Sequence, residues 1–450
     1  MGVLRTYWSS SEQELYVGSS NAEISVKSDD SEPEKTSLSK FLKSRCPSLF
    51  RTFSPAWWLN SGHLQTAYCV FGDFSKIDKV RYSRTLLRYR DGGTVGLDFT
   101  PPFGEREVPD DAPIVVALHG LTGGSHESYV RAVLAQAVRP KEEGGLGYRG
   151  VVVNFRGCAG VPFTSGQFYS AGYTDDLRRA CVYIQYRFPK ARLFGVGFSL
   201  GANVMIRYIA EEGRNSRLRA GCALGCPWDI HNNAIRINAS FFLRNVYSKS
   251  MGSNIVQLMK KHESELAQLP ESELTRITPE LFALKSPTLY DVDNCLTRRV
   301  GGNSPPFPFD SAEEYYTWGS SHHVLGDVRV PLLAINAADD PIVGHVPYDV
   351  GNNGHVALAL TPGGGHLGWF EAGERRWEVR RWVVRPVIEW LRAVGEDLIP
   401  EQDDFVPIEK DDEGWIHEVD NKRDDLSMKV LGDMEIIEGI EGEGGGLQGL

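Results

Sequence analysis

The fold is decided by the stretch Ala191-Arg-Leu-Phe-Gly-Val-Gly-Phe-Ser-Leu-Gly-Ala-Asn-Val-Met-Ile-Arg-Tyr208. Residues 193–196 form a short apolar run that is typical of a buried strand, and the apolar spacing from Val204 onward is that of a helix. The turn between them reads Gly197-Phe-Ser-Leu-Gly201. A serine between a strand and a helix lies on a sharp, strained turn, where a Cβ in place of either glycine would clash with the neighbouring elements. The stretch therefore predicts a nucleophile elbow at the carboxyl edge of a sheet.

An elbow at this position would present Ser199 as a nucleophile. The strained turn pushes Oγ above the sheet, and the backbone N–H of Leu200 is free at the helix N-terminus to stabilise an oxyanion. The pattern alone is weak, because a chain with 47 glycines in 450 residues contains it by chance roughly 0.3 times. The alternative is an ordinary glycine-rich turn. Residues elsewhere in the chain must therefore distinguish this turn from a nucleophile elbow.

The composition excludes several classes of protein. No run of about 18 apolar residues occurs, and the first 30 residues lack a charged and then apolar leader, so we expect no transmembrane helix and no secretory signal. The seven cysteines are odd in number and scattered, which is typical of reduced thiols, so we expect a cytoplasmic location. The sequence contains no basic stripe, so we expect no binding of nucleic acid.

The two ends of the chain differ in composition from the middle. Residues 1–50 are rich in Ser, Glu and Lys, and we expect most of them to be disordered. Of the formal net charge of -11, residues 401–450 carry -12, so the rest of the chain is close to neutral. We expect residues 397–450 to form an acidic, disordered tail, which leaves one folded domain over residues 51–396.

Within that domain the elements alternate. Residues 81–90 and 94–99 predict an antiparallel hairpin at a sheet edge, closed by Asp91-Gly-Gly. Buried strands are then expected at 114–118, 150–154, 193–196, 220–224, 331–336 and 355–360, and helices at 127–138, 174–187 and after the elbow. This alternation predicts an α/β fold with a mostly parallel sheet of the eight-stranded type and helices on both faces.

Two further segments flank the later strands. Residues 228–318 break the alternation with apolar helical patches among loops, and we expect them to form a helical cap over the site. After the last strand, the apolar residues from Trp377 to Trp390 predict one long amphipathic helix that covers the sheet.

A nucleophilic serine needs a base, and the base needs an acid that orients it. Asn336-Ala-Ala-Asp-Asp-Pro-Ile342 and Thr361-Pro-Gly-Gly-Gly-His-Leu-Gly368 each follow an expected strand, in the chain order Ser, Asp, His. We therefore expect His366 to be the base. The spacing does not choose between Asp339 and Asp340, since either could reach Nδ1 of His366 while the other faces solvent or caps the turn.

The second oxyanion donor is expected in the loop after residues 114–118. There Gly120 lets the backbone approach a carbonyl oxygen, so we assign the role to the N–H of Leu121. His119 is more consistent with a structural role beneath this site. No metal-binding pattern and no nucleotide fingerprint occurs, so we expect no metal and no cofactor.

Motifs spread over about residues 50–396 are recognisable in combination. They read Pro55-Ala-Trp-Trp, Gly62-His-Leu-Gln-Thr66, Asp91-Gly-Gly, His119-Gly-Leu-Thr-Gly-Gly124, Asn154-Phe-Arg-Gly157, Gly197-Phe-Ser-Leu-Gly201, Tyr315-Tyr316, Ser320-Ser321, Asp339-Asp340-Pro341 and Gly364-Gly-His-Leu-Gly368. Together they resemble the YheT-like branch of the α/β-hydrolases, which includes the fungal medium-chain fatty acid ethyl ester synthase/esterase group. The resemblance implies an α/β-hydrolase fold and a triad of Ser199, His366 and Asp340, the aspartate directly before proline.

The resemblance implies a serine esterase or acyltransferase. Its substrates would be short- to medium-chain fatty acyl esters or thioesters, and the acyl group would pass to water or to an alcohol. An esterase or acyltransferase that acts on a natural product is an alternative, and a binding protein of the same fold without turnover is a weaker one. Trp57 and Trp58 could touch a lipid surface, although packing at the sheet edge is the stronger expectation.

Overall fold

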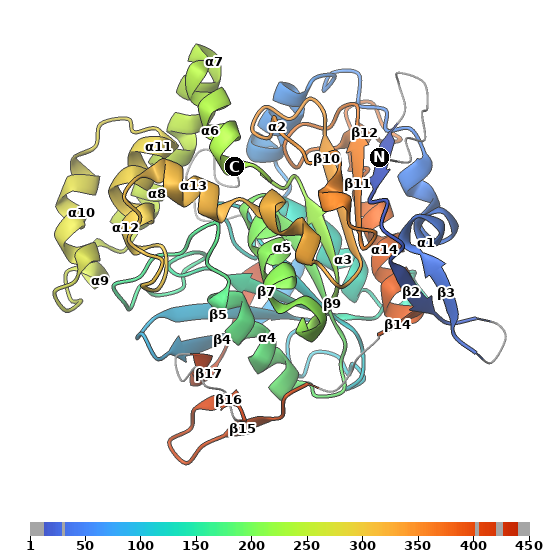
Figure 1. The fold of residues 1–450 in the computed structure, drawn as a ribbon, viewed down its shortest axis with the longest axis horizontal. Coiled ribbons are helices and arrows are strands. Elements are labelled where there is room, and N and C mark those ends of the chain that lie inside the picture. The colour runs from blue at the N-terminus through green and yellow to red at the C-terminus, as the bar shows by residue number, and fades with distance from the viewer. Residues whose placement is uncertain (1–12, 29–31, 401–404, 420–425, 440–450) are drawn as a thin grey trace.

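A parallel sheet organises the chain in the computed structural model, which describes residues 13–28, 32–400, 405–419 and 426–439 (Figure 1). Its six parallel strands are apolar segments that are buried along nearly their whole length: β6 (Ile114–Leu118), β7 (Arg149–Asn154), β8 (Leu193–Phe198), β9 (Leu218–Leu224), β10 (Leu332–Ala337) and β11 (Val356–Thr361). They lie in the order β11-β10-β9-β8-β6-β7. The strand before Ser199 therefore lies in the interior of the sheet.

The expected antiparallel hairpin is confirmed as β4 (Val80–Tyr89) and β5 (Thr94–Thr100), with β5 paired to β7. These eight strands form the expected mostly parallel sheet. The described residues add four more strands, β1 (Glu14–Val17), β15 (Ile408–Lys410), β16 (Ile416–Glu418) and β17 (Met428–Gly439). The full order is β1-β11-β10-β9-β8-β6-β7-β5-β4-β17-β16-β15. The hairpin is therefore not at the edge, because β17 (Met428–Gly439) pairs with β4.

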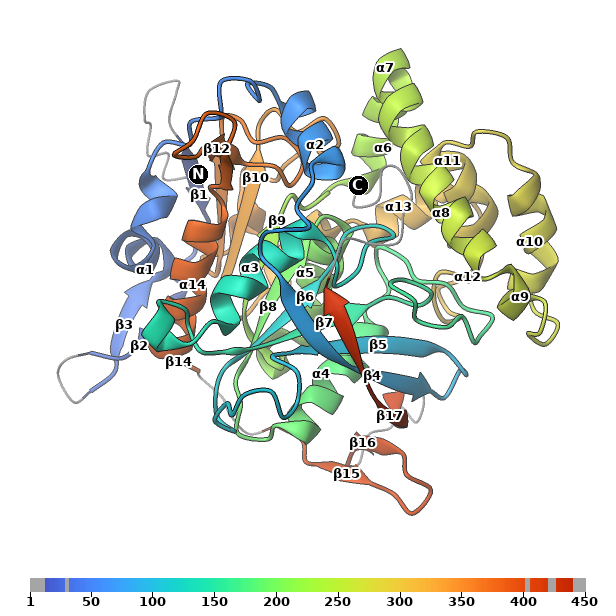
Figure 2. The ribbon, with the colours of Figure 1, turned by 180° about the vertical axis from the view of Figure 1, so that it is seen from behind.

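Helices cover both faces of the sheet. The side chains of α4 (Asp175–Arg187) and α5 (Leu200–Glu212) pack with one face, seen in front in Figure 1. Those of α3 (Ser128–Val138) and α14 (Val384–Glu396) pack with the other face, seen in Figure 2. The result is two hydrophobic cores, one on each side of the sheet. No helix in the described part of the chain is long and apolar enough to cross a membrane.

The helical insertion lies between β9 and β10. It consists of α6 (Ile230–Ala239), α7 (Phe241–Leu243), the π-helix η4 (Arg244–Ser248), α8 (Lys249–Lys261), α9 (Glu263–Leu266), α10 (Glu273–Ala283), α11 (Leu289–Val292), the π-helix η5 (Asp293–Thr297), α12 (Arg298–Val300) and α13 (Ala312–Gly319). Figures 1 and 2 show these helices gathered at one end of the molecule, beside α2 (Gly62–Phe71).

The described parts of the two ends are ordered, which differs from the expectation of disorder. Near the N-terminus, β1 (Glu14–Val17) pairs with β11, β2 (Glu23–Val26) and β3 (Glu34–Ser37) form a hairpin, and α1 (Leu38–Arg45) follows. The reason is that this segment is polar on average but contains a few apolar side chains that are buried against the domain. Phe41 and Leu42 of α1 are buried, and the Phe41 ring packs edge-on against that of Trp390.

At the C-terminal end, β15 (Ile408–Lys410) and β16 (Ile416–Glu418) form a hairpin that continues the sheet beyond β17. Leu426 and Met428 are buried, and the ring of Trp415 lies under the guanidinium of Arg90. These contacts explain why an acidic segment is ordered, since its few apolar side chains find partners on the sheet. Residues 401–404, 420–425 and 440–450 of the expected tail lie outside the described part.

The helix expected from Trp377 to Trp390 is wrong in its first half. Residues Val379–Arg381 form β13, which pairs with β12 (Phe370–Ala372), and α14 begins at Val384. Pro386 lies in the first turn of α14, where a missing N–H costs nothing. The apolar spacing of residues 377–383 therefore belongs to a hairpin and a loop.

Candidate functional site

Ser199 lies at the turn between β8 and α5 in a strained conformation. Its backbone angles, φ 49° and ψ -119°, are ones that a residue with a side chain rarely adopts. A Cβ at Gly201 would lie 2.4 Å from the carbonyl oxygen of Leu118, and one at Gly197 would lie 2.5 Å from Cα of Ala202. The turn is thus as tightly packed as the sequence pattern predicts.

Three residues expected from sequence meet at this turn. Nε2 of His366 lies 2.8 Å from Oγ of Ser199, and Nδ1 lies 2.8 Å from Oδ2 of Asp340. All three residues are buried. If Nδ1–H donates to Asp340, Nε2 is the acceptor for the Ser199 hydroxyl. This arrangement can take the hydroxyl proton and hold the imidazole in the required tautomer.

The two aspartates of the loop after β10 have different partners. Asp340 accepts hydrogen bonds from the backbone N–H groups of Ile342 and Val343 through Oδ1, which leaves Oδ2 for His366. Asp339 accepts from the N–H of Gly365 at 2.9 Å, and burial raises the pKa of Asp339. Asp339 is half-buried, and this partner lies in another loop and not in the turn that follows Asp339. It braces the loop that carries His366.

A second brace comes from α2, far away in the sequence. The N–H of His366 donates to Oγ1 of Thr66 at 2.8 Å, and the Thr66 hydroxyl donates to the carbonyl of Gly62 at 2.7 Å. The neighbouring Gln65 side chain exchanges hydrogen bonds with both backbone groups of Phe370. Sequence reasoning quoted the run from Gly62 to Thr66 as a motif but gave it no role. Its polar side chains on an otherwise apolar helix were the available signal.

Two backbone donors border the serine. In the described residues neither the N–H of Leu121 nor that of Leu200 has a hydrogen-bond acceptor, and both residues line the same cavity as Ser199. Gly120 packs against Ser199, where a Cβ would lie 3.5 Å from the serine Cβ. Two free N–H groups beside a nucleophile can stabilise an oxyanion.

His119 lies beneath these donors and is fully buried. Its Nδ1 lies 2.7 Å from the carbonyl oxygen of Gly120, and its Nε2 accepts a hydrogen bond from the N–H of Phe155. Burial lowers the pKa of His119 to about 4, so the ring is neutral at physiological pH. These contacts agree with the structural role expected from sequence, because neither ring nitrogen bonds to Ser199.

A cavity lies between the sheet and the insertion. Apolar side chains from both parts form most of its wall. It is lined by Leu121, Phe168, Tyr169, Ser170, Ala171, Ser199, Leu200, Pro227, Ile230, Asn233, Ala234, Ile237, Met251, Ile255, Leu289, Asp293, Thr297, Tyr315, Tyr316 and Ile342. Sequence reasoning missed two buried polar members of this wall, Asn233 and Asp293, because nothing in their local sequence marks them.

Asp293 belongs to a small polar cluster in that wall. It accepts hydrogen bonds from the hydroxyl groups of Thr297, at 2.6 Å, and Tyr316, at 2.8 Å. Burial raises the pKa of Asp293 to about 6. Both oxygens of this carboxyl are therefore already engaged by protein donors.

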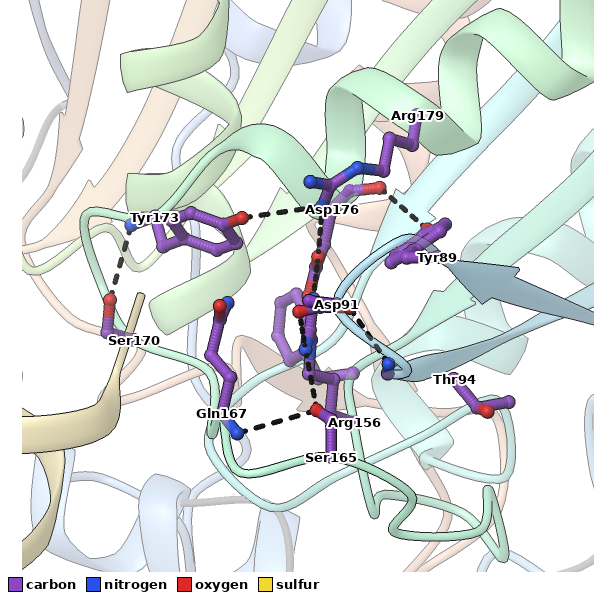
Figure 3. Close-up of polar contacts among 12 residues, drawn as sticks. Tyr89, Asp91, Thr94, Arg156, Ser165, Gln167, Ser170, Tyr173, Asp176 and Arg179 are labelled. Atoms are coloured by element: carbon purple, nitrogen blue, oxygen red, sulfur yellow. Dashed lines mark hydrogen bonds and ion pairs between the residues drawn. The ribbon is translucent and has the colours of Figure 1, made fainter. Parts of the chain in front are cut away.

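An ionic network supports the loop after β7. Figure 3 shows Arg156 between two carboxylates: its guanidinium makes two bonds to Asp176, at 2.7 and 2.8 Å, and one to Asp91 at 2.5 Å. Arg156 also donates to Ser165 at 3.1 Å, and Arg179 contacts the same Asp176 at 3.0 Å. Burial opposes ionisation of Asp91, but the adjacent Arg156 guanidinium lowers the pKa of Asp91.

This network joins the β4–β5 turn, the loop after β7 and the start of α4. Removing one member would leave a buried charge without a partner, which is strongly destabilising. The same loop continues into residues 168–171, which line the cavity. The network therefore fixes one wall of the cavity from behind.

The described residues contain no cluster of three or more His, Cys, Asp or Glu side chains that could hold a metal ion. All seven cysteines are free and buried.

Comparisons with known proteins find relatives over most of the chain. Residues 113–372 match the family described as the alpha/beta hydrolase fold. The chain is 32% identical over 377 residues to a monoacylglycerol lipase of Saccharomyces cerevisiae, with 76% of this chain and 80% of the relative covered. It is 28% identical over 403 residues to the medium-chain fatty acid ethyl ester synthase/esterase 2 of the same yeast, with 77% and 88% covered.

Solved structures of similar fold are more distant in sequence. An esterase of Pyrococcus furiosus is 18% identical, with 64% of this chain and 83% of the esterase covered and a TM-score of 0.36.

Proposed function

The chain belongs to the α/β-hydrolase family, and from that membership we propose that it is a serine hydrolase that cleaves carboxylic esters through an acyl-enzyme on Ser199. The observation that carries the proposal is the continuous hydrogen-bond chain from Ser199 through His366 to Asp340, at the edge of a largely apolar cavity. An ordinary glycine-rich turn would need neither the two partners nor the strained serine.

In the proposed mechanism, Oγ of Ser199 attacks the ester carbonyl carbon while its proton passes to Nε2 of His366. The carbonyl oxygen becomes an oxyanion, which the N–H groups of Leu121 and Leu200 stabilise. Asp340 accepts the Nδ1–H bond and stabilises the positive charge on His366. Collapse of the intermediate breaks the bond to the leaving alcohol, which takes the proton from His366 and departs.

The acyl group then leaves the serine by the same steps in reverse. Water or an alcohol gives its proton to His366 and attacks the acyl carbon, which releases an acid or a new ester. A thioester would react in the same way with a thiol as leaving group. The apolar wall that the helical insertion contributes disfavours water near the acyl group, which favours transfer to an alcohol.

The cavity wall supports short- to medium-chain fatty acyl groups as substrates. Apolar side chains of α6 and α8, Ile237, Met251 and Ile255, face the same space as Ser199. The relatives named above are a lipase and an ester synthase/esterase, and both kinds of protein act on esters.

We also infer peripheral contact with lipid from exposed aromatic side chains near α2 and α7. Trp57 is 64% exposed and Phe241 is 80% exposed. Both tryptophans contact the ring of Trp377, and Trp58 also packs on Tyr68, so Trp57 combines a ring contact with a largely exposed face. Because all the cysteines are free thiols, we propose the cytoplasm as the compartment.

The first experiment is labelling of the purified protein with a fluorophosphonate, followed by mass spectrometry. We expect one label on Ser199 and none in Ser199→Ala. We also expect Ser199→Ala to lower the hydrolysis of p-nitrophenyl esters at least a thousandfold, because the residual rate comes only from binding and the oxyanion donors. Circular dichroism of the variant provides the control for folding.

The same esters in increasing chain length, with and without ethanol, then identify the acceptor and the acyl preference. Ethyl ester as the main product would establish acyl transfer, and free acid would establish hydrolysis. A folded wild-type protein without label at Ser199 would contradict the proposed function.

A further inference from the structure

We propose that the side-chain amide of Asn233 binds the substrate through an oxygen atom other than the carbonyl oxygen that reacts with Ser199. The chemical class is an ester that carries a second oxygen acceptor, such as a hydroxyl, ether or carbonyl group, in the part enclosed by the cavity. This inference rests on the proposed function, because it concerns the same cavity.

The orientation of the Asn233 amide is determined by its neighbours. Asn233 lies on α6 and is only 4% exposed. One atom of its amide accepts two backbone N–H bonds, from Gly344 at 2.9 Å and from His345 at 3.2 Å. Only the carbonyl oxygen of an amide can accept N–H donors, so this atom is Oδ1 and the other is the NH₂ group.

That NH₂ group lacks a partner in the part of the chain that the structure describes. Within the described residues, Nδ2 of Asn233 is a buried donor without a hydrogen-bond acceptor. Buried polar groups are almost always hydrogen-bonded in folded proteins, and leaving one unpaired costs stability. Because Asn233 lines the cavity that contains Ser199, a substrate bound there can supply the missing acceptor.

The surrounding wall makes this donor selective. Its neighbours on α6 that line the cavity, Ile230, Ala234 and Ile237, are apolar and offer no hydrogen bond. The carboxyl group in the wall, that of Asp293, already accepts bonds from Thr297 and Tyr316. A plain alkyl group against Asn233 would leave the donor unpaired, whereas an oxygen atom would satisfy it. A site built in this way discriminates strongly against the analogue that lacks the oxygen.

A structural role for Asn233 makes a different prediction. In that case its only task would be to brace the loop at Gly344 and His345 through Oδ1. The substitution Asn233→Asp separates the two roles, since a carboxylate still accepts both N–H bonds but has no NH₂ donor. The matched control is Asn232→Asp, the same substitution at the adjacent exposed position of α6.

The test compares kcat/KM for two pairs of esters that differ in one oxygen. Propyl hexanoate and 2-hydroxyethyl hexanoate place the oxygen on the alcohol side, and ethyl hexanoate and ethyl 3-hydroxyhexanoate place it on the acyl side. We expect the wild type to prefer the oxygenated ester at least tenfold in one pair. In Asn233→Asp the ratio of kcat/KM for the oxygenated ester to that for its partner should fall below about three. Asn232→Asp should retain the ratio of the wild type.

Equal rates within both pairs for the wild type would overturn the proposal, and so would an unchanged preference in Asn233→Asp. Titration calorimetry of the same esters into Ser199→Ala and into Ser199→Ala/Asn233→Asp tests the inference without turnover. Preferential binding that disappears in the double variant supports it, and equal binding within each pair overturns it. A wild type that binds selectively but hydrolyses no ester contradicts the proposed function alone.

Discussion

Asp339 and Asp340 are neighbours in the sequence, yet their carboxylates accept hydrogen bonds from different partners. Asp340 contacts the imidazole of His366, while Asp339 contacts the backbone N–H of Gly365 in the same loop. The contact of Asp340 with His366 orients the imidazole ring and so affects proton transfer directly. The contact of Asp339 with Gly365 only positions the loop. A substitution that replaces one carboxylate oxygen by NH₂ should therefore have very different effects at the two positions.

We expect Asp340→Asn to lower kcat about a thousandfold to ten thousandfold, because the amide favours the wrong tautomer of His366 and cannot stabilise its positive charge. Asp339→Asn keeps one oxygen as an acceptor for Gly365 and should lower kcat less than about tenfold. Steady-state hydrolysis of a p-nitrophenyl ester measures both, with thermal unfolding as the folding control. An equal loss in both variants would contradict the different roles of the two carboxylates.

His119 gives the stability a predictable dependence on pH. Burial lowers its pKa to about 4, below the ordinary value of 6.5. Between these values the unfolded chain binds a proton that the folded protein does not. The contribution of His119 to the free energy of unfolding is therefore fully present above pH 6.5. It is lost as the pH falls toward 4, by about 3 kcal/mol in total.

His119→Asn removes this titrating group. We expect the free energy of unfolding of the wild type to fall more steeply than that of the variant between pH 7 and pH 4.5. Urea unfolding at several pH values measures the difference between the two proteins. Parallel curves for the two proteins would show that His119 does not titrate in this way.

At the scale of elements, the sequence predicts best where apolar periodicity and turn signals coincide. The segment 114–118 is apolar throughout and is followed by a glycine-rich loop, and β6 has these same bounds. The stretch after Trp377 failed because a hairpin and a helix each contribute apolar residues, and only Pro386 marks where α14 begins. The N-terminal helix α1 was missed because Phe41 and Leu42 lie among serines and lysines.

The same contrast holds for the elements of the site. Ser199 and His366 follow strands of the same sheet, so chain order alone predicts that they meet. Thr66 and Asn233 could not be found in this way, because each is positioned by a hydrogen bond to a loop distant in the chain. The choice between Asp339 and Asp340 needed the direction of two side chains, which spacing does not contain.

At the scale of the whole molecule, the two ends of the chain cover the two edges of the α/β sheet. β1 pairs with β11 at one edge, and β17 pairs with β4 at the other. The sheet now ends in β1, of four residues, and β15, of three residues, and such short edge strands offer few unpaired N–H and C=O groups to other chains. The cavity that contains Ser199 is lined in part by the helical insertion, and its described lining includes no residue of β15, β16 or β17.

This separation predicts that the C-terminal strand contributes to stability and not to catalysis. Met428 of β17 is fully buried opposite Tyr89 of β4. We expect Met428→Ala to lower the free energy of unfolding by about 2–4 kcal/mol through the lost burial and the cavity left behind. When kcat/KM is measured well below the melting temperature, it should change less than twofold.

The control is Val430→Ala on the same strand, where the side chain is 43% exposed. It should lower the stability by less than about 1 kcal/mol, because little apolar surface is removed from the core. Thermal and urea unfolding of both variants measure these differences. If the acidic tail were disordered, neither substitution would change the free energy of unfolding. If the strand is paired with β4, only Met428→Ala should lower it substantially.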